Sequence, residues 1–128
     1  MNESKRVTLY DRIGGEAAVA RMMDSFYERV LADPELAPFF ARVSMEKVRS
    51  MQTLFFCTAL DGPLEYSGRP LATVHYGLGI RPPHLTRFVG HLLATLRDLR
   101  LDENDVLEIV SRIDTYADEI TGDTSVDA

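Results

Sequence analysis

Residues 16–32 read EAAVARMMDSFYERVLA, and apolar side chains recur in this stretch at spacings of three and four residues. That spacing places them on one side of an α-helix, in a stripe wide enough to be buried against other elements. Asp33 and Pro34 follow directly, and proline cannot continue a helix because it lacks the backbone N–H. The stretch therefore predicts an amphipathic helix from Glu16 to Ala32. Its apolar positions are Val19, Met22, Met23, Phe26, Tyr27, Val30 and Leu31.

The same period recurs in three further stretches and predicts an all-α fold. Ser44 is a suitable N-cap for a helix that ends near Leu60. A third helix is expected from Leu85 to Leu99, and a fourth follows Asp102, another capping residue. No alternation with a period of two competes with these patterns. We therefore expect four substantial helices joined by short turns.

Glycine and proline mark the connections between these helices. Gly14 and Gly15 should end a short helix that Thr8 caps. Residues 34–40 contain too much proline for more than one helical turn, and residues 61–69 have the composition of a loop. Pro70 is expected to start a short helical turn, and further breaks are expected at Gly77, Gly79, Pro82 and Pro83.

Length and composition indicate one globular domain. The chain has 128 residues, of which about 7–120 should form the core and 121–128 a polar tail. Its 14 basic and 20 acidic residues give a net charge of −6, which argues against a nucleic-acid partner because phosphate contacts need Lys and Arg. Cys57 is the single cysteine, which excludes an internal disulfide. No apolar stretch is long enough for a membrane span and no signal sequence is evident, so we expect a cytoplasmic protein without a membrane partner.

Two polar side chains interrupt the apolar stripes. On the helix after Ser44, Gln52 lies on the same side as Val48 and Phe56, so its amide points into an apolar face. The ordinary explanation is a hydrogen bond to a nearby backbone carbonyl. Tyr27 lies on the stripe of the preceding long helix, where a buried hydroxyl needs a partner. Taken alone, it is an ordinary boundary tyrosine.

His75 is a third unusual residue, because it directly precedes the glycine-rich segment YGLG at residues 76–79. A single histidine beside a glycine loop is usually exposed or structural. Combined with two buried polar tips, however, it suits an apolar pocket around a flat cofactor such as haem, whose iron needs one neutral nitrogen donor. The apolar candidates for this pocket are Phe40, Val48, Phe55 and Phe56.

Five stretches carry a family resemblance, and their order and spacing fit as well. They read LYDRIGG at 9–15, FYERVLAD at 26–33, PFF at 38–40, QTLFF at 52–56 and VHYGLGI at 74–80. Over about residues 7–120 the chain resembles the truncated haemoglobins, group I in particular. The family's second glycine pair is represented here by Asp61 and Gly62.

The resemblance implies that residues 1–128 form a single globin domain, a two-over-two helical sandwich around haem b, iron protoporphyrin IX. It implies that His75 is the proximal iron ligand and that Tyr27 and Gln52 are the distal pair that stabilises a bound ligand. Val48 occupies the position where other globins often carry histidine, and it cannot donate a hydrogen bond. The remaining haem contacts would be Phe40, Phe55, Phe56, Tyr66, Leu71, Ile80 and Phe88, with Tyr66, Arg69 and Arg81 as candidates to hold the propionates.

The resemblance also implies a function in gas chemistry. We expect reversible O2 binding and oxidation of nitric oxide to nitrate at the ferrous-oxy haem, with CO as a further ligand. The chain has no flavin or nicotinamide motif, so the electrons would come from a separate reductase. One alternative is a non-enzymatic oxygen-binding or storage protein or a gas sensor. Another is a helical interaction module without haem. Peroxidase activity is less favoured, because neither Tyr27 nor Gln52 is a good acid–base catalyst at neutral pH.

The two other histidines have structural interpretations. His84 falls in the first turn of its helix and is expected to be exposed. His91 borders the apolar stripe of the same helix and is expected to be structural. Cys57 is expected to pack in the core.

Overall fold

The computed structural model describes residues 7–63 and 80–115. Every regular element in these two segments is helical, so the predicted all-α class is confirmed. The predicted turn at Pro70, the predicted breaks at Gly77 and Gly79 and the predicted part of the last helix beyond residue 115 lie outside the described residues. The elements are α1 (Leu9–Ile13), α2 (Gly15–Leu31), the 3-10 helix η1 (Ala37–Phe40), α3 (Met45–Ala59), α5 (Pro82–Asp98) and α6 (Glu103–Asp114).

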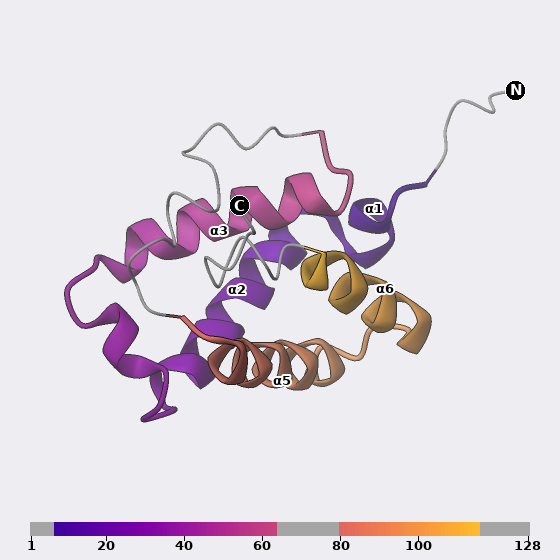
Figure 1. The fold of residues 1–128 in the computed structure, drawn as a ribbon. Coiled ribbons are helices and arrows are strands. Elements are labelled where there is room, and N and C mark those ends of the chain that lie inside the picture. Colours follow the sequence, from indigo (N-terminus) through magenta and orange to yellow (C-terminus); the bar gives the residue numbers. More distant parts are fainter. Residues whose placement is uncertain (1–6, 64–79, 116–128) are drawn as a thin grey trace, which may run out of the picture.

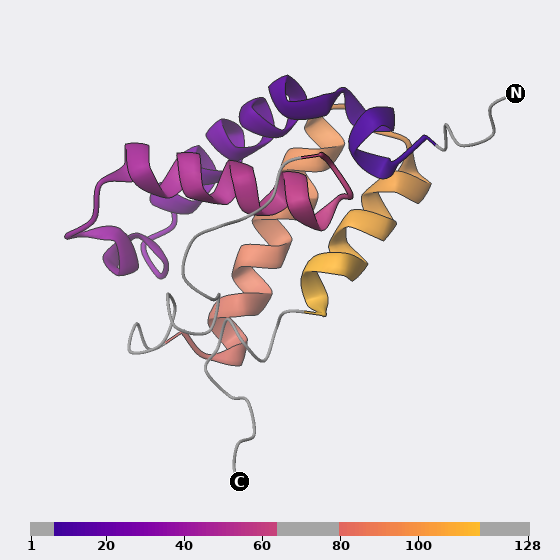
Figure 2. The ribbon, with the colours of Figure 1, turned by 90° about the horizontal axis from the view of Figure 1, so that it is seen from above.

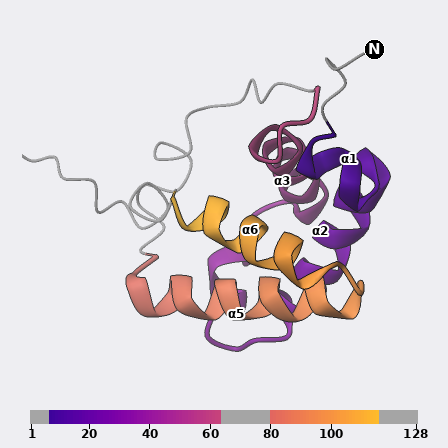
Figure 3. The ribbon, with the colours of Figure 1, turned by 90° about the vertical axis from the view of Figure 1, so that its right-hand side faces the viewer.

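The long helices form two pairs that pack on each other, as the two-over-two arrangement requires. Figure 1 shows α2 between α3 and α5, and α2 has its main packing contacts with these two helices. Seen from above, α3 runs back along α2 (Figure 2). Figure 3 shows α6 running back along α5 in the same way. None of the described helices has the length and apolar character needed to cross a membrane.

The starts of α1 and α3 follow the local capping rules. Thr8 caps α1: its hydroxyl accepts a hydrogen bond from the Asp11 N–H at 3.1 Å, and the Asp11 carboxylate accepts one from the Thr8 N–H at 3.4 Å. The Ser44 hydroxyl accepts one from the Lys47 N–H at 3.3 Å and so caps α3. Between α1 and α2, Gly14 has a φ of 117°, a conformation that favours glycine. The expected break is therefore confirmed, although α2 begins one residue before the predicted start.

Two predictions for the region where α5 begins are wrong, the chain break at Pro82 and Pro83 and the exposure of His84. Pro82 and Pro83 do not break the chain but form the first turn of α5, where a helix needs no proline N–H. His84 is half-buried rather than exposed. Its Nδ1 accepts a hydrogen bond from the Arg81 N–H at 3.0 Å, and its ring meets that of Phe39 edge-on at 5.0 Å. The first contact comes from the residue directly before the helix and the second from η1, and the periodicity of α5 describes neither.

The core lies where the apolar stripes of the four long helices meet. The predicted stripe of α2 is buried except for Leu31, which is half-buried. Cys57 of α3 is completely buried, in keeping with a packing role. The side chains with less than 2% exposure include Val19, Met22, Met23, Val30, Leu60, Leu96, Val106 and Ile109.

The turn after α3 explains why a single glycine is sufficient there. Asp61 adopts a positive φ of 70°, and its carboxylate accepts a hydrogen bond from Arg112 Nη1 at 2.9 Å. A Cβ at Gly62 would lie 2.7 Å from the Tyr10 ring and 2.9 Å from the Cys57 carbonyl oxygen, so only glycine fits at that residue. Asp61 can replace a glycine because an aspartate tolerates the left-handed conformation and Arg112 holds its side chain.

Candidate functional site

An aromatic cluster joins α2, η1 and α5. Tyr27 meets Phe40 edge-on at 5.7 Å between ring centroids, and Phe40 meets Phe88 in the same way at 6.3 Å. Phe26 lies 4.8 Å from Tyr27 and 6.3 Å from Phe88, and Phe39 lies 6.4 Å from Phe88. These edge-on and tilted arrangements are the favourable ones for aromatic pairs. The structure therefore brings together three of the predicted site residues, Tyr27, Phe40 and Phe88.

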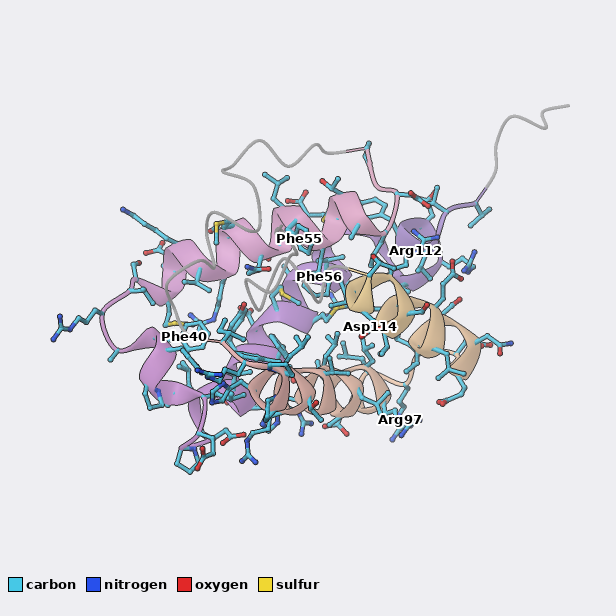
Figure 4. The ribbon with its side chains drawn as sticks, in the orientation of Figure 1. Phe40, Phe55, Phe56, Arg97, Arg112 and Asp114 are labelled. Atoms are coloured by element: carbon cyan, nitrogen blue, oxygen red, sulfur yellow. The ribbon has the colours of Figure 1, made fainter. Side chains whose placement is uncertain are left out.

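The second part of the candidate site is the buried face of α3. Gln52, Phe55 and Phe56 are all buried on this helix, and Val48, one turn before Gln52, is half-buried. The Phe55 and Phe56 rings meet edge-on at 5.8 Å. Figure 4 shows both residues toward the second half of α3, with Phe40 on the side where that helix starts. This helix packs on α2, which carries Tyr27.

The polar tips of Tyr27 and Gln52 have no hydrogen-bond partner within residues 7–63 and 80–115. Their side chains are nevertheless almost enclosed, since Tyr27 is 5% exposed and Gln52 is 9% exposed. The ordinary explanation for Gln52, a bond to a nearby backbone carbonyl, therefore fails in this part of the chain. The two tips are not sealed off completely, because the buried side-chain atoms without a partner among the described residues are Arg29 Nε and Arg49 Nε. Two donors remain available to a bound molecule.

Burial also sets the protonation state of Tyr27. Removal from water raises the pKa of its hydroxyl well above the usual value, because the phenolate is poorly stabilised there; the positive charge of Arg49 opposes this in part. Tyr27 is therefore a neutral hydrogen-bond donor at physiological pH. Gln52 keeps its donating amide at any pH, since the amide does not titrate.

Several predicted site residues lie outside the described part of the chain. His75, Tyr66, Leu71 and Arg69 all fall within residues 64–79, so their roles remain predictions. Of the predicted residues that border this segment, Ile80 is 5% exposed and Arg81 is exposed. Among the described residues, no group of three or more His, Cys, Asp or Glu side chains is placed to hold a metal ion.

An ion cluster around the buried Asp33 carboxylate has no counterpart in the sequence predictions. Asp33, just after α2, accepts hydrogen bonds from Arg87 at 2.9 and 3.1 Å, and one of its carboxylate oxygens lies 2.7 Å from His91 Nε2. The cluster fixes the part of α5 that carries Phe88 against the end of α2. The structural role expected for His91 is confirmed. No local pattern could reveal the cluster, because Asp33 is 54 and 58 residues away from its partners.

The family relationship of the chain is clear from its sequence and fold. The profile of the Bacterial-like globin family matches residues 8–122. The group 1 truncated hemoglobin of Mycolicibacterium paratuberculosis is 38% identical over 118 residues, which cover 92% of this chain and 87% of that protein. The group 1 truncated hemoglobin of Synechocystis is 37% identical over 108 residues, which cover 81% of this chain and 87% of that protein.

A solved structure gives the same result for the fold. The Fe(III) form of truncated hemoglobin from Tetrahymena pyriformis has a TM-score of 0.85 with this chain and is 30% identical. The match covers 90% of this chain and 98% of the Tetrahymena protein. The two-over-two fold expected from the resemblance is thus confirmed. This chain belongs to the Bacterial-like globins and, among them, to the group 1 truncated haemoglobins, which use haem as their cofactor and bind diatomic gases.

Proposed function

We propose that this protein binds O2 reversibly and oxidises nitric oxide to nitrate, with Tyr27 and Gln52 holding the bound gas. The observation that carries this proposal is the burial of the Tyr27 and Gln52 side chains, whose polar tips have no hydrogen-bond partner among the described residues. Enclosed donors of this kind suit a ligand that develops negative charge in an otherwise apolar site. The aromatic cluster and the buried face of α3 would exclude water from it.

The residues predicted to hold haem would form one site in a single domain of residues 1–128. His75 would bind the iron, and Tyr66, Arg69 or Arg81 would hold the propionates. When bound, haem supplies gas binding and the one electron needed as nitric oxide and O2 combine to nitrate. An external reductase would return that electron. The remaining contacts would come from Phe40, Val48, Phe55, Phe56, Leu71, Ile80 and Phe88.

Tyr27 and Gln52 would act by donating hydrogen bonds to the gas. Each bond to a charged acceptor contributes about 1.5–3 kcal/mol, which corresponds to roughly ten- to a hundredfold in affinity. Val48 contributes no donor, so the hydrogen bonds on this side of the pocket come from the other two residues. Slow oxygen release should follow, and this favours turnover of the bound gas over its transport.

Solved forms of a relative support this choice of residues. Truncated hemoglobin from Tetrahymena pyriformis has been solved with one tyrosine changed to phenylalanine and with either of two glutamines changed to glutamate. The second of those glutamines lies as far beyond the tyrosine as Gln52 lies beyond Tyr27. The first lies at the spacing of Val48, so this chain would keep one glutamine of the two.

Rapid mixing of the oxygenated ferrous protein with nitric oxide tests the proposed reaction. We expect conversion to the ferric protein within the mixing experiment, and one nitrate for each oxygenated protein molecule consumed. Tyr27→Phe is the matched variant and should release oxygen before it reacts, giving less nitrate. Ferric protein without nitrate, or no conversion at all, would show that the protein is not a nitric oxide dioxygenase.

A further inference from the structure

An ion pair lies one helical turn away from the proposed distal pair. Arg49 on α3 precedes Gln52 by three residues, and Asp24 on α2 precedes Tyr27 by three residues. Residues three apart on a helix are neighbours on its surface. Arg49 Nε lies 3.8 Å from the Asp24 carboxylate, so the pair bridges α2 and α3 beside the two residues that the proposed function assigns to gas binding.

The two charges of this pair are not equally exposed. The Asp24 side chain is 74% exposed, whereas that of Arg49 is 36% exposed. Arg49 Nε is itself buried and has no hydrogen-bond partner among the described residues, because 3.8 Å is too long for a hydrogen bond. Water therefore screens Asp24 well and shields Arg49 only on one side.

The positive charge of Arg49 acts on the buried hydroxyl of Tyr27. The Arg49 guanidinium lowers the pKa of the Tyr27 hydroxyl, against the larger effect of burial, which raises it. A positive charge that favours a phenolate at this place also favours any other negative charge there. Oxygen held by Tyr27 and Gln52 would carry such a charge.

We propose that Arg49 tunes the oxygen affinity of the distal site, its positive charge stabilising the partial negative charge of the bound gas while Asp24 offsets part of it. This inference rests on the proposed assignment of Tyr27 and Gln52 as the distal pair, and it does not depend on the reaction with nitric oxide. The alternative is that the ion pair only fastens α3 to α2. The two possibilities predict different effects of removing each charge. If the pair only holds α3 on α2, removing either charge should change the distal site in the same direction. If the charges act on the bound gas, removing Arg49 and removing Asp24 should have opposite effects.

The C–O stretching frequency of the ferrous carbon monoxide complex, measured by infrared absorption, separates these possibilities. A positive potential at the ligand oxygen weakens the C–O bond and lowers this frequency. We expect Arg49→Met to raise the frequency and to accelerate O2 release by roughly two- to fivefold, the range for a partly screened charge. Asp24→Asn should lower the frequency and slow O2 release. Arg49→Lys keeps the charge and should restore a frequency near that of the wild type.

Two matched variants complete this experiment. Lys47→Met removes an exposed positive charge from the same helix and should leave the frequency unchanged. Tyr27→Phe should raise the frequency, which checks the distal assignment itself. Shifts of the same sign in Arg49→Met and Asp24→Asn would overturn the proposal, as would an unchanged frequency in Arg49→Met when Tyr27→Phe shifts it. An unchanged frequency in Tyr27→Phe would overturn the distal assignment, a failure that is separate from a missing reaction with nitric oxide.

Discussion

At the scale of single residues, Asp33 shows how a buried charge is stabilised in this fold. It is the only buried acidic residue in the described part of the chain. Hydrogen bonds from Arg87 and then His91 hold the pKa of its carboxyl far below the usual aspartate value, against the opposing effect of desolvation. The ionised carboxylate thus ties the end of α2 to α5, next to the Phe88 ring.

Asp33→Asn should lower the free energy of unfolding at neutral pH and make that free energy depend less on pH in the acid range. Because the pKa is lower in the folded than in the unfolded state, the ionised carboxylate stabilises the fold above about pH 4, and this stabilisation is lost as the pH falls toward the folded-state pKa. Denaturant unfolding at several pH values would measure it. Asp114→Asn removes an exposed carboxylate and serves as the control. Equal acid dependence of wild type and Asp33→Asn would contradict this prediction.

Individual residues were predictable where helical periodicity decides their environment. The burial of Tyr27 and Gln52 followed from their places on apolar stripes, and the structure confirms it. The ion cluster of Asp33 was not predictable, because its partners are brought in by tertiary packing of α5. Local sequence indicated only that Asp33 and Pro34 end a helix.

At the scale of elements, the start of α3 depends on one hydroxyl. Ser44 accepts a hydrogen bond from the Lys47 N–H, which would otherwise lack a partner in the first turn. This helix carries both Arg49 and Gln52, so its first turn supports the proposed distal site.

Ser44→Ala should lower the free energy of unfolding by about 0.5–2 kcal/mol, the usual effect of losing an N-cap. Ser44→Asp keeps an acceptor at the cap and places a negative charge at the helix start, so it should retain most of the wild-type stability. Urea unfolding followed by circular dichroism measures both variants. Equal losses of unfolding free energy in the two variants would show that the side-chain cap at residue 44 does not cause the destabilisation.

Helix boundaries were predicted to within a residue or two where caps and glycines are present, as at Thr8, Gly14 and Ser44. The predicted boundary was wrong at the start of α5. Proline can follow the end of a helix or stand in its first turn, and the sequence pattern alone does not distinguish these two cases. The hydrogen bonds that support the turn after α3 could not be predicted from the local sequence, since they come from Arg112 on α6.

At the scale of the whole molecule, the fold brings α2, η1, α3 and α5 around the proposed haem site. The contact of Tyr27 with Phe40, and of Phe40 with Phe88, joins residues far apart in the sequence. Periodicity predicted the helices but not these contacts, and only the family resemblance indicated how the helices pack. Gas binding follows from the family, while the chemistry of the bound gas remains our proposal.

His75→Ala should abolish stable haem retention, because it removes the proposed nitrogen ligand of the iron. The absorbance spectrum of the purified protein after expression with ample haem reports this directly. His84→Ala is the control: it should retain haem, since His84 Nδ1 already accepts the Arg81 N–H. A spectrum like that of the wild type in His75→Ala would disprove the ligand assignment.

The rate of oxygen dissociation from the ferrous protein tests the central claim, that Tyr27 and Gln52 together hold the bound gas. Tyr27→Phe and Gln52→Leu should each accelerate release by roughly ten- to a hundredfold. The double variant should release oxygen less rapidly than the product of the two single accelerations predicts, because both donors act on the same ligand. Fast release from the wild type that neither substitution changes would contradict the claim and favour a plain oxygen-binding protein or a sensor.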